Sequence, residues 1–157
     1  MKAIVLTPAP IQPEDVQPLI DTNIEKYAIN GHAEWLKPTY RICSDYGVIG
    51  YLLEYFPQKI ITTREYAQNK RLIYAGDISF KGSTMTACIE YLVSRGYKKI
   101  LIIGDNTVHD KLFQDRINTE IKRILEENSD VEIFQYSKGN FNLPIMTVQK
   151  FIKEGEK

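Results

Sequence analysis

Cysteine and long apolar runs are scarce in this sequence, and each scarcity excludes a class of protein. Two cysteines, Cys43 and Cys88, are too few for a disulfide framework, and both lie among apolar residues, so we predict small buried thiols. No apolar run approaches the roughly 18 residues of a membrane-spanning helix, and the prolines after the first apolar run argue against a signal peptide. We therefore expect a cytoplasmic protein with no membrane span.

Net charge is absent as well. The 157 residues include 20 Lys or Arg and 20 Asp or Glu. A neutral chain has no broad attraction to nucleic acid or to anionic membranes, although a local basic site remains open. The glycine-rich signatures G-x-G-x-x-G and G-x-x-x-x-G-K-[ST] are missing, which argues against dinucleotide and P-loop sites. No group of Cys and His has the spacing of a zinc site.

The sequence does contain short β-branched runs that alternate with segments of helical period. This alternation predicts a three-layer, Rossmann-like α/β domain with a mostly parallel sheet and helices on both faces. The length favours a single domain over residues 1–157. The predicted strands are Lys2–Leu6, Glu25–Ile29, Tyr40–Cys43, Lys59–Thr62, Arg71–Tyr74, Lys99–Ile103 and Val131–Tyr136. The predicted helices are Glu14–Asn23 (limited by Pro18), one turn at His32–Leu36, Tyr46–Phe56, a helix after Ser83 and Thr84, Asp110–Glu127 and Thr147–Lys153.

Ligands of open α/β sheets bind beyond the carboxyl ends of the strands, so the residues just after each predicted strand are the candidate site. Turns also need Gly, Ser, Asp and Asn for backbone reasons alone, and this alternative stays open for each position. The candidate ligand-binding residues are Asn30, Gly31, Ser44, Asp45, Arg64, Gly82, Ser83, Thr84, Gly104 and Asn106.

Three kinds of chemistry are expected from these positions. Gly82–Thr84 begins a helix, whose free N–H groups and dipole suit a phosphate. Arg64 can grip a diphosphate or form a surface pair with Glu65. His109 is the candidate general acid or base, with His32 as a second histidine near the crevice.

Acidic residues also follow two of the predicted strands. Asp105 is the second catalytic candidate, and Asp45 follows another strand. Each carboxylate can bind a metal ion or a ribose hydroxyl, or it can cap a helix.

The segment G-S-T-M-T-A-C-I-E-Y-L-V-S-R-G-Y-K-K-I-L-I-I-G-D resembles a block of the family 42 sialyltransferases. The related bacterial motility accessory factors and the 6-hydroxymethylpterin diphosphokinase-like proteins share this layout. Two further segments agree in position, Y-A-I-N-G-H-A-E-W-L-K-P-T-Y-R-I-C-S-D and Y-S-K-G-N-F-N-L-P-I-M-T-V-Q-K-F. The resemblance spans most of the chain, but its motifs are loose.

In those sialyltransferases, residues at strand ends hold the nucleotide of a CMP-sugar. The resemblance matches Asn30 to an asparagine after the second strand, Ser83 and Thr84 to a hydroxyl pair, and Gly104 to a glycine. Asp45 stands in place of a family asparagine.

The chain departs from the family pattern in two places. Its first turn reads Thr7-Pro8-Ala9-Pro10 instead of a glycine-rich loop, and proline donates no N–H to a phosphate. The lid that carries the family's catalytic histidine is missing, so that role does not pass to His109.

Three functions are therefore open. The leading hypothesis is a domain that binds a nucleotide or nucleotide sugar, such as a sialyltransferase-like glycosyltransferase without the usual lid. The alternative is a pterin-type diphosphokinase, which needs Mg²⁺ held by carboxylates beside the phosphates. The third is a non-catalytic accessory module in glycan biosynthesis. A homodimer is a further hypothesis, because edge strands of small α/β domains often pair.

Overall fold

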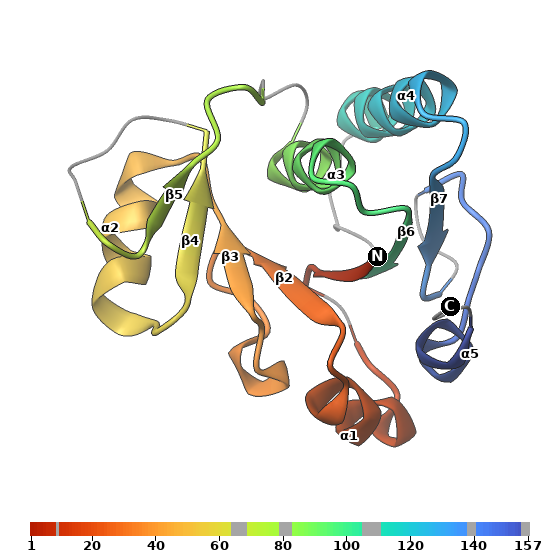
Figure 1. Cartoon of the computed structure of the whole chain (residues 1–157), viewed down its shortest axis with the longest axis horizontal. Coiled ribbons are helices and arrows are strands. Elements are labelled where there is room, and N and C mark those ends of the chain that lie inside the picture. Colours follow the sequence, from red (N-terminus) through yellow and green to blue (C-terminus); the bar gives the residue numbers. More distant parts are fainter. Residues whose placement is uncertain (9, 64–68, 79–82, 105–110, 138–140, 155–157) are drawn as a thin grey trace.

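The computed structural model contains one seven-stranded sheet between two layers of helices (Figure 1). It describes residues 1–8, 10–63, 69–78, 83–104, 111–137 and 141–154. The strands are β1 (Lys2–Leu6), β2 (Glu25–Ile29), β3 (Tyr40–Ile42), β4 (Lys59–Thr62), β5 (Leu72–Tyr74), β6 (Lys99–Ile103) and β7 (Glu132–Gln135). All seven predicted strands are confirmed, with ends that differ by a residue at β3, β5 and β7.

The strand order is β5-β4-β3-β2-β1-β6-β7, and every pair of neighbours is parallel. The chain first builds outward from β1 to β5, then returns across the sheet and adds β6 on the other side of β1. The order therefore reverses between β1 and β6. This arrangement confirms the predicted α/β class, and the sheet is parallel throughout rather than mostly parallel.

The helices divide between the two faces of the sheet. Residues of α1 and α5 share a core cluster with Ile4 and Leu6, and α2 packs on the same side against Ile60. The helices α3 and α4 pack on the opposite face, where α3 lies over β1 and β2. The helices are α1 (Pro13–Asp21), the 3-10 turn η1 (Glu34–Leu36), α2 (Tyr46–Tyr55), α3 (Thr84–Ser94), α4 (Lys111–Glu127) and α5 (Val148–Lys153).

Local sequence signals explain where two of these helices begin and end. Asp45 is the N-cap of α2, and its Oδ1 accepts hydrogen bonds from the N–H groups of Gly47 (2.9 Å) and Val48 (3.4 Å). Ser83 caps α3 in a reciprocal pair with Thr86. Gly96 follows α3 with a φ of 92°, a left-handed conformation that glycine adopts without strain. Pro18 lies inside α1, which ends one turn later.

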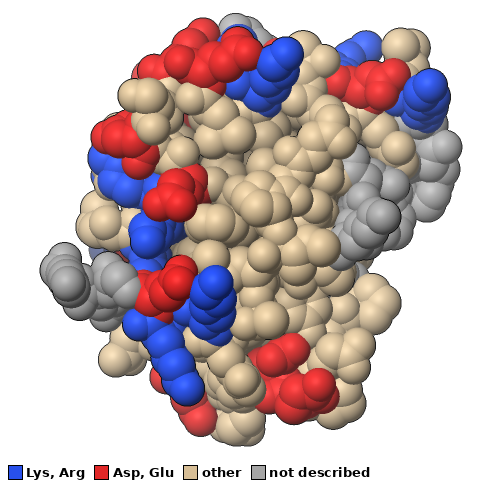
Figure 2. All heavy atoms as spheres, turned by 90° about the vertical axis from the view of Figure 1, so that its right-hand side faces the viewer, with Lys and Arg blue, Asp and Glu red and all other residues tan. Residues whose placement is uncertain are grey.

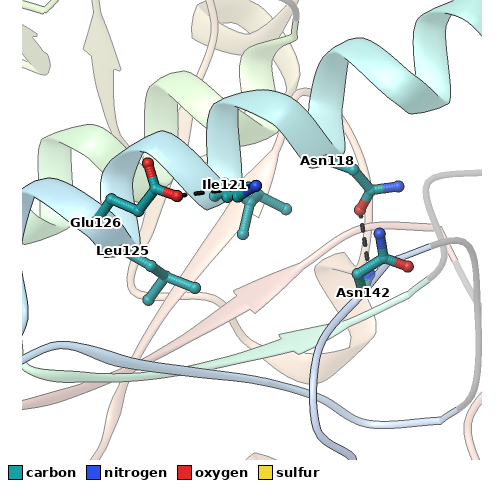
Figure 3. A pocket seen from close by; sticks show the side chains of 6 residues that line it. Asn118, Ile121, Leu125, Glu126 and Asn142 are labelled. Atoms are coloured by element: carbon teal, nitrogen blue, oxygen red, sulfur yellow. Dashed lines mark hydrogen bonds and ion pairs between the residues drawn. The ribbon is translucent and has the colours of Figure 1, made fainter.

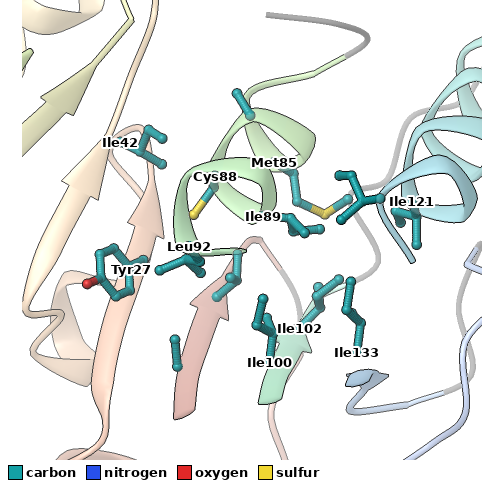
Figure 4. Close-up of a cluster of buried hydrophobic side chains, with 14 of the residues drawn as sticks. Tyr27, Ile42, Met85, Cys88, Ile89, Leu92, Ile100, Ile102, Ile121 and Ile133 are labelled. Atoms are coloured by element: carbon teal, nitrogen blue, oxygen red, sulfur yellow. The ribbon is translucent and has the colours of Figure 1, made fainter. Parts of the chain in front are cut away.

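The larger core lies under α3 and α4. Cys88, Ile89 and Leu92 point from α3 toward the sheet, and Met85 points toward Ile121 of α4 (Figure 4). Strands β1 and β6 are buried on both faces, which accounts for their nearly continuous apolar sequences.

Both cysteines are buried, as predicted. Burial raises the pKa of the Cys43 thiol to about 11, and it also raises that of Cys88. Neither thiol is therefore an activated nucleophile. Among the described residues, no helix has the length and apolar character of a membrane span.

Polar side chains at the amino-terminal edge of the sheet are buried against helix ends. The Lys2 Nζ donates to the carbonyl of Phe151 (2.7 Å) at the end of α5, and the Lys26 Nζ donates to the carbonyl of Leu19 (2.5 Å) at the end of α1. Each ammonium thus satisfies an orphan carbonyl and lies at the negative end of a helix dipole.

The same edge carries a buried tyrosine pair. The Tyr27 and Tyr97 hydroxyls are 2.8 Å apart, and the Tyr97 hydroxyl donates to the Glu25 carboxylate. Tyr40 stacks on Tyr27 with ring centroids 5.2 Å apart.

Candidate functional site

Because all seven strands are parallel, their carboxyl ends meet at one edge of the sheet. This carboxyl edge carries small polar residues at the strand ends: Thr7 after β1, Asn30 after β2, Ser44 after β3, Thr63 after β4 and Gly104 after β6. The strand order reverses between β1 and β6, and open α/β sheets form their ligand crevice at such a reversal. Thr7 and Gly104 lie at this reversal.

Gly104 and Thr7 are packed so closely that no side chain fits between them. A Cβ added at Gly104 would overlap the Thr7 Oγ1 and would lie 3.0 Å from the Thr7 carbonyl oxygen. Gly104 has a φ of 124°, which L side chains rarely adopt. The Thr7 hydroxyl and N–H both donate to the Ile103 carbonyl, at 3.1 and 2.9 Å. The buried N–H of Gly104 has no acceptor among the described residues.

A buried arginine that the sequence analysis did not single out donates hydrogen bonds to the loop after β2. Arg41 is completely buried, and its guanidinium donates to the carbonyls of Asn30 (2.9 Å) and His32 (2.6 Å). It also pairs with the Glu34 carboxylate, donates to the Gln58 Oε1 and lies over the Phe56 ring. The only available signal in the sequence was a charged residue inside an apolar strand.

This loop has an unusual backbone that Arg41 stabilises. Asn30 and Ala33 have positive φ values of 52° and 60°. Non-glycine residues in this region are uncommon, and asparagine tolerates it better than most. The backbone of Asn30 is fixed by its bonds to Ile42 and Arg41, while its side-chain amide bonds to no described residue.

His32 lies in the same loop with an exposed side chain. Desolvation and the positive charge of Arg41 lower the pKa of His32 from its usual value. The loop bends toward α2, because a Cβ at Gly31 would contact Leu52 and Phe56. Asn30, Gly31 and His32 therefore flank the carboxyl edge on the α2 side.

On the opposite face, the start of α3 brings Ser83 and Thr84 to the same edge. The Ser83 hydroxyl is used in the cap, where it accepts from the Thr86 N–H at 3.1 Å. Thr84 is half-buried, and its hydroxyl makes no hydrogen bond within the described parts of the chain. The first N–H groups of α3 are directed at this edge, where the helix dipole is positive.

Other predicted residues are occupied by their own structure. The Ser44 and Thr63 hydroxyls are 3.0 Å apart and hydrogen-bond to each other. The Asp45 carboxylate is the α2 cap described above, which is the structural alternative left open by the sequence. Five predicted residues lie outside the described residues: Arg64, Gly82, Asp105, Asn106 and His109.

The described residues do not assemble a metal site. No group of three His, Cys, Asp or Glu side chains is placed to hold a metal ion within the described ranges. A cavity of about 340 Å³ lies between α4 and the segment after β7, and not among the strand-end residues (Figure 3).

Comparison with known proteins adds little to this geometry. No family model matches the chain, and no curated protein matches it. One solved structure, described as a probable thiamine pyrophosphokinase from Staphylococcus saprophyticus, aligns with a TM-score of 0.43 and 16% identity. The alignment covers 86% of this chain and 64% of that chain. The sialyltransferase resemblance gains no support from these comparisons. The chain is an α/β protein with a seven-stranded parallel sheet.

Proposed function

We propose that the carboxyl edge of the sheet binds a small phosphate-bearing metabolite above β1 and β6. The observation that carries this proposal is a set of donors along the carboxyl edge that have no acceptor among the described residues. These donors are the Gly104 N–H, the Thr84 hydroxyl and the Asn30 amide. A buried N–H without an acceptor costs free energy, and a bound anion removes that cost.

Each part of the edge has a separate role in this proposal. The N–H groups at the start of α3 and the Gly104 N–H receive the phosphate, since both present donors without a charged side chain. The Asn30 amide, which can donate and accept, hydrogen-bonds the organic part of the ligand. A nucleotide or nucleotide sugar is the first class of ligand to test.

Diphosphate transfer is the alternative reaction for the same edge. It requires Mg²⁺, and the described acidic residue at this edge, Asp45, already caps α2. We therefore derive no step through a metal ion.

The test is calorimetric titration with CMP, CDP, UDP, GDP and inorganic diphosphate, each with and without Mg²⁺. Asn30→Gly keeps the left-handed backbone and deletes the amide, and Thr84→Val deletes the free hydroxyl. Each variant is expected to weaken binding about tenfold, the effect of one lost hydrogen bond. Asn23→Gly and Thr119→Val, at exposed positions away from the edge, are the matched controls. A folded protein that binds none of these ligands at millimolar concentration contradicts the proposal.

A further inference from the structure

The outermost segment beside β7 has an unpaired backbone edge. Residues 143–146 run alongside β7, where the Gln135 N–H donates to the Pro144 carbonyl and the Met146 N–H donates to the Gln135 carbonyl, both at 2.9 Å. Backbone groups of successive residues in an extended segment point in alternate directions. The N–H and C=O of Ile145 therefore point away from β7, and neither has a partner in the described structure.

Hydrogen bonds from Gln135 and to Asn118 fix this segment against β7 and α4. The Gln135 side chain is buried, and its Nε2 donates to the carbonyls of Phe141 (3.0 Å) and Leu143 (2.6 Å). Asn142 is fixed to α4 by the bond from its N–H to the Asn118 Oδ1 at 3.1 Å. The free edge at Ile145 is therefore preorganised, and a partner strand would not have to order it.

The segment that contains Ile145 carries no charged residue. No charged residue lies between Phe141 and Gln149, although a quarter of the chain is Asp, Glu, Lys or Arg. Figure 2 shows a broad uncharged area on this side of the molecule, with charged side chains gathered around it. The Ile145 side chain is 56% exposed, and Asn142 of the same segment lines the 340 Å³ cavity together with Ile121, Leu125, Lys122 and Glu126.

We propose that this edge is a homodimer interface, in which Ile145 pairs with Ile145 of a second copy about a two-fold axis. A residue whose N–H and C=O both face outward forms a hydrogen-bonded antiparallel pair with its own symmetry mate, which exchanges both bonds. Near a two-fold axis every charge meets its own copy, so a charge-free strip is what self-association requires. The two sheets then become continuous across the interface.

The outer strand β5, at the other end of the strand order, provides the control. Tyr74 of β5 is 57% exposed, comparable to Ile145, and it also lies at the outer edge of the sheet. Substitutions at Tyr74 thus separate a specific effect at Ile145 from a general effect of altering an exposed sheet edge.

The first experiment is sedimentation equilibrium of the chain over a wide concentration range. The unaltered protein should dimerise, Ile145→Lys should weaken the dimer at least tenfold by placing two ammonium groups at the axis, and Tyr74→Lys should leave it unchanged. A wild-type protein that is monomeric throughout overturns the proposal. A dimer that persists in Ile145→Lys also overturns the proposal. A chain that associates with an extended peptide of another protein, but not with itself, overturns it as well.

The second experiment reads the register of the pair. Ile145→Cys should form a disulfide-linked dimer with oxidised glutathione, because Cα atoms in such a pair lie about 5.5 Å apart, within the range of about 4.4–6.8 Å for disulfides. The wild-type protein should not cross-link, since both native thiols are buried. Tyr74→Cys is the matched control and should remain monomeric on non-reducing gels. Equal cross-linking of the two cysteine variants overturns the assignment.

Discussion

The amino-terminal and carboxyl edges of the sheet, where the strands begin and end, use polar groups in opposite ways. At the amino-terminal edge, the Lys2 and Lys26 ammonium groups bond to helix carbonyls, and the Tyr97 hydroxyl bonds to Tyr27 and Glu25. At the carboxyl edge, the Asn30 amide and the Gly104 N–H have no acceptor in the described structure, although Thr7, Ser44 and Thr63 are paired. Buried polarity alone therefore does not mark a ligand site. Polar groups that are already paired hold the fold together, and those that are unpaired are available to a ligand.

Arg41 is the strongest test of this contrast, because it is paired itself but supports the unpaired edge. Arg41→Ala leaves the Asn30 and His32 carbonyls without donors and removes a fully buried side chain. We expect a loss of about 3–4 kcal/mol in the free energy of unfolding, measured with urea, and weaker ligand binding in the fraction that folds. Arg95→Ala removes an exposed pair with Asp77 and should change stability far less. Equal effects of the two substitutions would remove Arg41 from this role.

Gly104→Ala tests the close contact at the reversal of strand order. The added methyl group meets Thr7 in a backbone conformation that alanine disfavours, so we expect a loss of about 2–3 kcal/mol in urea unfolding. Combining it with Thr7→Ala should restore part of this loss, because the overlapping hydroxyl is gone. Gly47→Ala, where the nearest atom is the Asp45 Oδ1 at 3.4 Å, is the control and should not destabilise. A tolerated Gly104→Ala would show that the two strand ends are not in contact.

Lys26→Met tests the amino-terminal edge. The substitution keeps much of the apolar stem but leaves the Leu19 carbonyl without its donor, so we expect a loss of about 1–2 kcal/mol. Ligand affinity should not change, in contrast to the expected result for Arg41→Ala. Parallel urea unfolding and calorimetric titration measure both quantities. A fall in affinity without a fall in stability would break the proposed division between the edges.

The smallest effect is expected from Tyr97, in alkaline solution. Burial, together with the Glu25 carboxylate, raises the pKa of Tyr97 from 10.0 to about 12. The protonated phenol is therefore favoured in the folded state. Its contribution to stability is complete below pH 10 and is lost as the pH rises toward 12. Tyr97→Phe should flatten this loss in urea unfolding between pH 10 and 12, whereas the exposed Tyr55→Phe should leave the profile unaltered.

Periodicity and turn residues were sufficient to predict the fold. The apolar runs Lys2–Leu6 and Lys99–Ile103 predicted strands, and Asp45 and Ser83 marked the starts of helices. These signals are local, so they are legible without knowledge of the rest of the chain. The order of the strands is not local, and the position of β1 at the reversal became visible only in the structure.

The candidate site was only partly legible for the same reason. The strand-end rule selected Asn30, Thr84 and Gly104, but the sequence does not say whose hydrogen bonds are already made. Asp45 was selected by the same rule and turned out to cap its own helix. Arg41 was overlooked because its role depends on partners that only folding brings to it. These partners are Glu34, Gln58 and the carbonyls of Asn30 and His32.

The central place of β1 has a consequence for the order in which the protein is made. One side of β1 hydrogen-bonds to β2, which follows it closely in the sequence. The other side pairs with β6, from Lys2 with Lys99 to Leu6 with Ile103, and β6 is synthesised much later. On the ribosome, most of the chain is synthesised while an apolar strand exposes one open side. Such strands invite aggregation, and pairings this distant in sequence are slow to form. We therefore expect nascent chains that end before β6 to need chaperone protection.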